Sequence, residues 1–139
     1  MRKSVLIVDD VAFVRKTLAA ILHENGFEVV GEAASGPDAI EQYQRLRPEL
    51  VTMDIVMPRM SGIEATRKII KENPEARVVM ISAMGQETLV MESIHAGARD
   101  YILKPFSADE VVRTLTHCLE HHRASGLGAH RHSREHKLG

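Results

Sequence analysis

Five short apolar runs, separated by segments with helical periodicity, constrain the fold of this chain more than any other feature. Most of the runs are continuous rather than alternating, which is typical of strands buried on both faces of a sheet. Repeated alternation of strand and helix predicts a parallel sheet with helices on both faces, the α/β class. The runs are Val5–Val8, Val29–Ala33, Leu50–Met53, Val78–Ile81 and Tyr101–Leu103.

The segments between the runs carry signals for the start and the end of helices. Ser107 with Glu110 three residues later has the pattern of a capping box, which starts the last predicted helix. Asn25-Gly26 and Gly97 are stop signals. We expect helices from about 12 to 24, from about 35 to before Pro48, from 86 to 96, and from 107 to about His122, and a further helix marked by Ile63, Ile69 and Ile70 that ends at Asn73-Pro74.

The length of 139 residues predicts one domain with a single core. No apolar run is long enough to span a bilayer, so we expect no membrane insertion. The start of the chain, "MRKSVLIVDD", has only four apolar residues before two acids, which does not fit a signal peptide. A cytoplasmic location is therefore expected.

The last 17 residues, 123–139, differ in composition from the rest. They are basic and contain His130, His132 and His136, and they show no apolar periodicity. We expect an ordered domain over residues 1–122, mildly acidic overall, followed by a disordered tail. Neither part has the pattern of a DNA-recognition helix, and an acidic body argues against nucleic acid as a partner. The one cysteine, Cys118, lies at helical spacing among apolar residues and is expected to be buried.

Polar side chains stand where four of the five runs end. Asp9 and Asp10 follow the first run, Asp54 the third, Ser82 the fourth and Lys104 the fifth. Ligands of parallel sheets bind beyond the carboxyl ends of the strands, so these side chains are predicted to converge on one site.

Three carboxylates at one edge repel one another unless a cation lies among them. The available ligands are oxygens, without cysteine or histidine, which selects a hard ion and most simply Mg²⁺. A lysine and a hydroxyl beside such an ion suit a phosphoryl group, and Asp54 is then a nucleophile that becomes an aspartyl phosphate. The alternative for the adjacent pair is structural, with Asp10 as the N-cap of the helix that begins near Ala12.

Four motifs together resemble the receiver domain of bacterial response regulators. They are "VDD" (8–10), "MDIVMPRMSG" (53–62), "ISA" (81–83) and "YILKPF" (101–106), and the likeness covers residues 4 to about 121. Within this family "VTMDIVMP", "ISAMGQ" and "AGARDYILKPF" are most similar to CheY-type chemotaxis regulators. The resemblance implies a flavodoxin-like, doubly wound (βα)5 fold with strand order 2-1-3-4-5.

The resemblance also implies a function, that of a single-domain response regulator of a two-component system. Asp54 is the expected phosphoacceptor. Asp9, Asp10 and Asp54, with the backbone carbonyl of Val56, are the expected Mg²⁺ ligands. Such a protein is a phosphoacceptor that assists its own phosphorylation and dephosphorylation rather than an enzyme with a separate substrate.

Three further residues receive roles from the resemblance. Ser82 is expected to move toward the phosphoryl group, Tyr101 to act as an aromatic switch, and Lys104 to pair with the phosphate. The Lys104–Pro105 peptide bond is expected to be cis.

The expected partners are a histidine kinase as phosphodonor and an effector protein, in the chemotaxis interpretation the flagellar motor switch. The resemblance places the effector on the fourth helix, fifth strand and fifth helix. On the fourth helix the periodicity puts Leu89, Ser93 and Ala96 toward the sheet and Val90, Met91 and Ile94 outward, so these three, with Tyr101, are the predicted docking residues.

A phosphatase is a further expected partner. Val56 and Met84, two residues after Asp54 and Ser82, should border the path of a hydrolytic water, and neither can orient that water. Slow intrinsic loss of the phosphoryl group, and hence a separate phosphatase, is the expectation.

Other functions remain open at this point. An intermediate receiver of a phosphorelay would use the same residues. A Mg²⁺-dependent phosphohydrolase with an aspartyl nucleophile usually has a second acid two residues later, where this chain has Val56. A flavin carrier of the same fold class would need donors for the flavin phosphate, whereas these loops are acidic.

Overall fold

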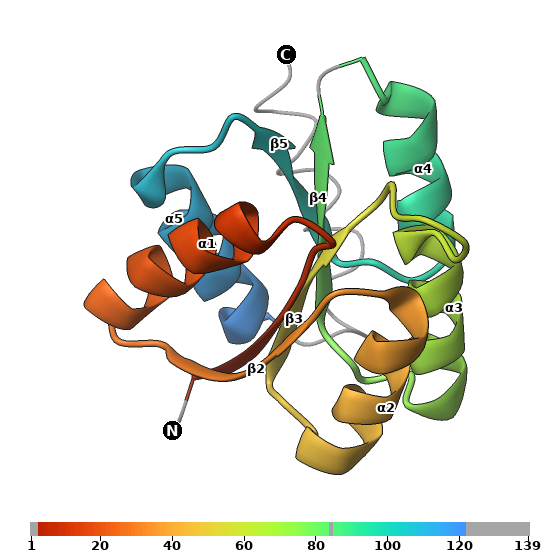
Figure 1. Cartoon of the computed structure of the whole chain (residues 1–139), viewed down its shortest axis with the longest axis horizontal. Helices are drawn as coiled ribbons and strands as arrows, with labels where there is room; N and C mark the ends of the chain where they lie inside the picture. Colours follow the sequence, from red (N-terminus) through yellow and green to blue (C-terminus); the bar gives the residue numbers. More distant parts are fainter. Residues whose placement is uncertain (1–2, 84, 122–139) are drawn as a thin grey trace.

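The computed structural model describes residues 3–83 and 85–121, in which strands and helices alternate along the chain (Figure 1). The strands are β1 (Ser4–Val8), β2 (Glu28–Ala33), β3 (Leu50–Asp54), β4 (Val78–Ala83) and β5 (Asp100–Lys104). The helices are α1 (Ala12–Glu24), α2 (Gly36–Leu46), α3 (Gly62–Glu72), α4 (Glu87–His95) and α5 (Ala108–Glu120). All ten elements were predicted, with small differences at their ends.

The five strands form one parallel sheet in the order β2-β1-β3-β4-β5, which confirms the predicted topology. Several strands extend one or two residues beyond their apolar runs. The ladder of β3 with β4 pairs Asp54 with Ile81, and that of β4 with β5 pairs Ala83 with Lys104. Asp54 and Lys104 thus belong to the sheet itself, and they lie at the edge where the candidate site is found.

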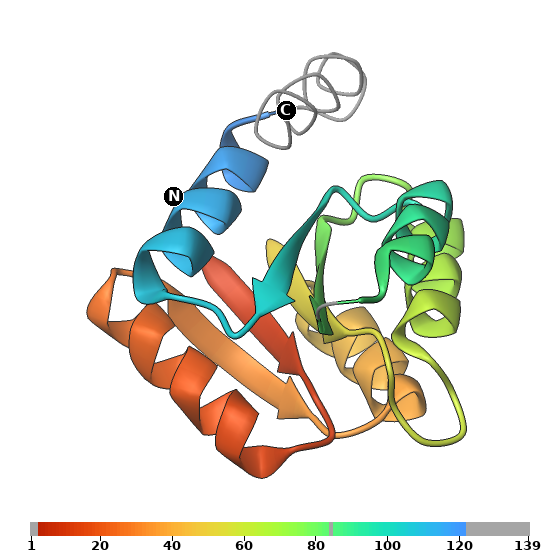
Figure 2. The same cartoon turned by 90° about the horizontal axis from the view of Figure 1, so that it is seen from above.

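Helices cover both faces of the sheet, with α1 and α5 on one face and α2, α3 and α4 on the other (Figures 1 and 2). Each face has its own apolar core. In β1, Val5 and Ile7 enter the core beneath α1 and α5, while Leu6 and Val8 enter the core beneath the other three helices. This division explains why the runs are continuous, since both faces of a central strand are buried.

Serine side chains cap the starts of α2, α3 and α5. The Ser107 hydroxyl accepts a hydrogen bond from the Glu110 amide, and the Glu110 carboxylate accepts one from the Ser107 amide, so the predicted capping box is present.

Cys118 of α5 is buried as expected, and this burial raises the pKa of its thiol to about 12. No helix in the described part of the chain is long and apolar enough to cross a membrane. The predicted tail at 123–139 lies outside the described residues.

One prediction for α4 is wrong. Val90 was expected on the outward face, but it is only 8% exposed and belongs to the core beneath α4. Ile94 is half-buried against the same core, and of the three predicted outward residues only Met91 is well exposed, at 55%. The reason is that α4 packs on α3 as well as on the sheet, so a wider arc of the helix is covered than one sheet face requires.

Candidate metal and phosphoryl site

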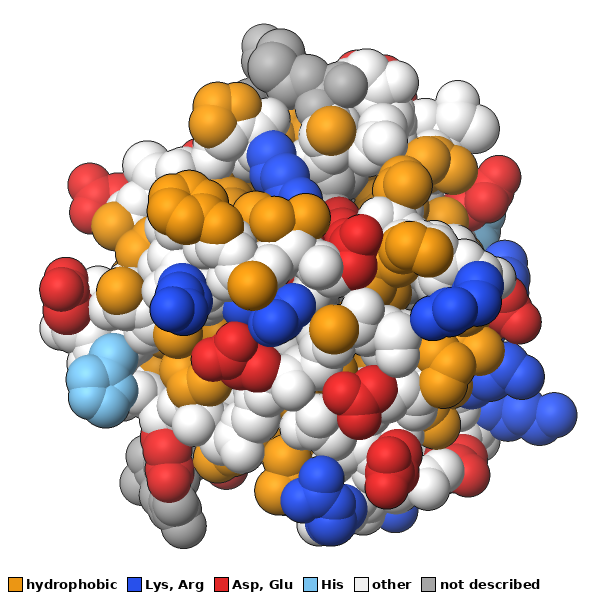
Figure 3. Space-filling view, viewed as in Figure 1, with side chains coloured by type: hydrophobic (Ala, Val, Ile, Leu, Met, Phe, Trp, Pro, Cys, Tyr) orange, Lys and Arg blue, Asp and Glu red, His pale blue; other side chains and the backbone are white. Residues whose placement is uncertain are grey.

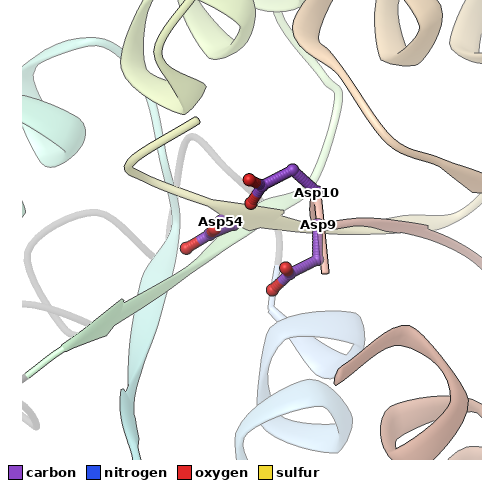
Figure 4. A group of neighbouring side chains, drawn as sticks. All are labelled: Asp9, Asp10 and Asp54. Atoms are coloured by element: carbon purple, nitrogen blue, oxygen red, sulfur yellow. The ribbon is translucent and has the colours of Figure 1, made fainter. Parts of the chain in front are cut away.

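Three acidic side chains meet at the carboxyl edge of the sheet. Asp9 follows β1 directly and its amide donates to the carbonyl of Ala33 at 3.0 Å, which ties this residue to β2. Asp54 is the last residue of β3. Carboxylate oxygens of Asp9, Asp10 and Asp54 lie within 4.8 Å of one another, and Figure 4 shows how they approach from the ends of β1 and β3. The predicted convergence of these acids is confirmed.

The three carboxylates differ in their contact with solvent. Asp9 is fully buried and Asp54 is 7% exposed, whereas Asp10 is exposed. Burial, the neighbouring charge of Asp9 and, more weakly, that of Asp10 raise the pKa of Asp54 to about 6, against the lowering influence of Lys104. The carboxylate form of Asp54 is thus disfavoured where it stands, and any cation added to the site will favour it.

Lys104 extends from the end of β5 to both buried acids. Its Nζ lies 3.4 Å from Oδ2 of Asp9 and 3.5 Å from Oδ1 of Asp54. The sequence placed this lysine at the edge but gave no indication that it contacts both acids. The Lys104–Pro105 peptide bond that follows is cis, as the resemblance implied.

The structural alternative for the acid pair is wrong. The N-cap of α1 is Val11, and no side chain caps this helix end. Oδ1 of Asp9 accepts a hydrogen bond from the Val11 amide at 2.9 Å, while the Asp10 carboxylate makes no hydrogen bond to any described residue. Asp10 is therefore not used by the helix and remains available for a ligand.

The donors present fit a hard divalent cation. All three side chains offer carboxylate oxygens, one of them facing solvent, which leaves room for water or phosphate oxygens around an ion. No other group of this kind, with three or more acidic, histidine or cysteine ligands, occurs among residues 3–83 and 85–121.

Ser82 lies at this edge, near the end of β4, whereas Tyr101 is the second residue of β5 and pairs with Met80. The Ser82 side chain is buried, at 1% exposed, and its hydroxyl has no hydrogen-bond partner among the described residues. A buried hydroxyl without a partner is costly unless a ligand supplies one. Tyr101 is half-buried and packs against the core beneath α4. Val56 turns its side chain to solvent, at 55% exposed, and Met84 lies outside the described residues.

A glycine fixes the position of the β3 end. The Gly62 amide donates to the carbonyl of Ile55 at 2.7 Å, and a Cβ at Gly62 would overlap the backbone carbonyl of Asp54 and lie 2.9 Å from Cγ of Met53. Only glycine permits this approach. The sequence analysis quoted this residue within a motif but gave it no role, because the contact is visible only once α3 is placed against β3.

The comparisons with known proteins define the class. The model of the response regulator receiver domain family matches residues 5–116, and the chain belongs to this family.

Two of the similar proteins are chemotaxis proteins named CheY. The chemotaxis protein CheY of Thermotoga maritima is 51% identical over 115 residues, which cover 83% of this chain and 96% of the relative. CheY of Bacillus subtilis is 50% identical over 119 residues, 86% of this chain and 99% of the relative.

Solved structures of response regulator proteins have a similar fold. The response regulator domain of Thermotoga maritima CheB matches with a TM-score of 0.80 and 35% identity, covering 87% of this chain and 98% of that one. CheY in a CheX–CheY–BeF3–Mg²⁺ complex from Borrelia burgdorferi matches with a TM-score of 0.78 and 38% identity, covering 81% and 86%.

Proposed function

We propose that this protein is a response regulator of chemotaxis signalling that accepts a phosphoryl group on Asp54. The observation that carries the proposal is the cluster of Asp9, Asp10 and Asp54 with Lys104 bridging two of the acids. Asp9, Asp10 and Asp54, with the backbone carbonyl of Val56, are the proposed Mg²⁺ ligands. The bound ion supplies positive charge that Asp54 and a phosphoryl group both require.

In the proposed reaction an Asp54 carboxylate oxygen forms a bond to phosphorus while the bond between phosphorus and the donor's histidine nitrogen breaks. The electron pair of that bond stays on the imidazole, which leaves. Lys104 then pairs with the phosphoryl oxygens, since its ammonium already reaches the Asp54 carboxylate. The buried Ser82 hydroxyl donates to the same oxygens, which gives it the partner it lacks.

The proposed partners are a histidine kinase, an effector and a phosphatase. The loops around the acids expose apolar side chains, with Val11 at 47% and Val56 at 55%, and Figure 3 shows hydrophobic and charged side chains mixed over this face. An apolar rim suits a protein that inserts a polar side chain into the site. The CheX–CheY complex among the similar structures supports a further protein partner for the present chain.

For the effector we propose the surface of α4, β5 and α5, with Met91 and Tyr101 as contacts and Ile94 at its margin. Val90 is not part of it, because its side chain is in the core. The flagellar motor switch is the proposed effector, by the likeness to CheY. Phosphorylation would bias Tyr101 between two positions as Ser82 moves toward the phosphoryl group.

The test uses acetyl phosphate as a small phosphodonor and intact mass as the measurement. The wild type should gain one phosphoryl group with Mg²⁺ and none with EDTA, and Asp54→Asn should gain none under either condition. Asp109→Asn, an exposed acid at the start of α5, is the matched control and should react like the wild type. Equal phosphorylation of Asp54→Asn and the wild type would overturn the proposal.

A further inference from the structure

The backbone of the loop that carries two of the acids is held by an arginine that neither the sequence analysis nor the proposed site includes. Arg15 lies in the second turn of α1, and its Nη1 donates to the backbone carbonyl of Asp9 at 2.6 Å. Its Nε donates to Oε1 of Glu32 in β2 at 3.1 Å. The Arg15 side chain is 18% exposed and its hydrogen bond to Asp9 is partly buried, whereas the Glu32 side chain is 41% exposed and its bond to Arg15 lies at the surface.

Together these contacts satisfy every polar group of Asp9. The amide donates to Ala33, the carbonyl accepts from Arg15, Oδ1 accepts from Val11 and Oδ2 faces Lys104. Asp9 is thereby fixed by the sheet through its amide and by α1 through its carbonyl, and this carbonyl belongs to the peptide unit that joins Asp9 to Asp10.

The position of Asp10 depends on that peptide unit. Its own carboxylate is exposed and has no hydrogen bond to a described residue, so nothing at the end of the side chain holds it in place. The carbonyl that precedes Asp10 is held by Arg15, and the Asp10 carboxylate lies within 4.8 Å of the other two acids.

Glu32 in turn is tied to the neighbouring layer. Its backbone carbonyl accepts from Nε2 of Gln42 in α2 at 2.9 Å, and the same amide group lies 3.1 Å from Oδ2 of Asp38. Arg15 is therefore paired with an exposed side chain whose backbone is fixed in β2 and held to α2. Glu32 also balances its charge, which would otherwise oppose a cation at the acids.

We infer that Arg15 is a positioning residue for the metal site, which holds the Asp9 carbonyl and thereby places Asp10 for a divalent cation. The inference rests on the proposed Mg²⁺ site. A positioning role and a purely electrostatic role of Arg15 predict opposite changes in Mg²⁺ affinity when the arginine is removed. Removing a positive charge near three acids would raise the affinity for a cation, whereas losing a positioning contact lowers it, typically by about 10–100-fold for partners of metal ligands.

The experiment measures Mg²⁺ affinity by isothermal titration calorimetry for the wild type, Arg15→Met and Lys16→Met. Methionine keeps an unbranched stem and removes the charge in both variants. Lys16 is the matched control, because it neighbours Arg15 on α1, is exposed and contacts none of the acids. We expect Arg15→Met to bind Mg²⁺ about tenfold more weakly and Lys16→Met to bind as the wild type does or slightly more tightly.

Arg15→Lys keeps the charge but not the two-pronged geometry, and should fall between Arg15→Met and the wild type. A second measurement needs no metal: amide hydrogen exchange at Asp10 and Val11 should be faster in Arg15→Met than in Lys16→Met, while both variants keep the urea midpoint of a folded protein. Equal or tighter Mg²⁺ binding by Arg15→Met, or unchanged exchange at these amides, would overturn the inference. Absence of Mg²⁺ binding by the wild type would instead refute the proposed function.

Discussion

At the scale of single residues, the main feature of the candidate site is a carboxylate whose charged form is disfavoured by its surroundings. Asp54 is nearly buried beside Asp9, and its pKa of about 6 reflects burial first and like charge second. The residue types and their order along the strands were enough to predict this group. The contacts that hold the acids were not predictable. Arg15 donates to the backbone carbonyl of Asp9, and the Gly62 amide donates to that of Ile55. No pattern of residue types indicates which backbone carbonyl a donor will reach.

The raised pKa of Asp54 gives a pH-dependent prediction for the metal-free protein. The folded state holds the Asp54 proton more tightly than the unfolded state, whose pKa is near the ordinary 3.8. Its contribution to stability is therefore complete below about pH 4 and is lost as the pH rises through about 6. Replacing the carboxyl group by an amide removes this loss.

We expect Asp54→Asn to gain about 1–3 kcal/mol in free energy of unfolding relative to the wild type between pH 4 and pH 7.5. Urea unfolding of both proteins in EDTA measures the difference at each pH, and the titration of groups remote from Asp54 cancels in this difference. A difference that stays constant with pH would show that Asp54 has no raised pKa.

At the scale of elements, the hydrophobic pattern predicted every strand and helix but not how far each helix is covered. The run of apolar residues in β1 is buried on both faces, as predicted from its continuity. In α4 the same logic failed at Val90, since periodicity gives the direction of an apolar face but not the presence of α3 beside it. The exposed apolar face of α4 is therefore narrower than predicted.

This difference predicts unequal costs for two neighbouring substitutions. Val90→Ala removes a side chain from the core and should lower the free energy of unfolding by about 1–3 kcal/mol. Met91→Ala removes an exposed side chain and should change it by no more than about 0.5 kcal/mol. Urea unfolding curves of the two variants check this, and similar losses in both would mean that α4 packs differently from the structure described.

At the scale of the whole molecule, the sheet brings residues from three strands to one edge, and a cation bound there would contact several of them. Asp9, Asp54 and Lys104 are far apart in the sequence, and their proximity follows from the strand order. A cation that binds only the folded arrangement stabilises the fold by mass action.

Mg²⁺ should therefore raise the free energy of unfolding of the wild type, by about 2.7 kcal/mol when its concentration is 100 times the dissociation constant. Asp10→Asn should lose most of this gain while unfolding normally without metal, because Asp10 is exposed and takes no part in capping α1. Thermal unfolding with Mg²⁺ and with EDTA measures both quantities. An undiminished gain in Asp10→Asn would remove Asp10 from the proposed ligands.

Locating the modified residue tests most directly whether Asp54 carries the phosphoryl group. Borohydride reduces an aspartyl phosphate to homoserine, which peptide mass spectrometry identifies by position. After reaction with acetyl phosphate and Mg²⁺ we expect homoserine at position 54 and unmodified aspartate at 9 and 10. Homoserine at another position with Asp54 intact would contradict this expectation.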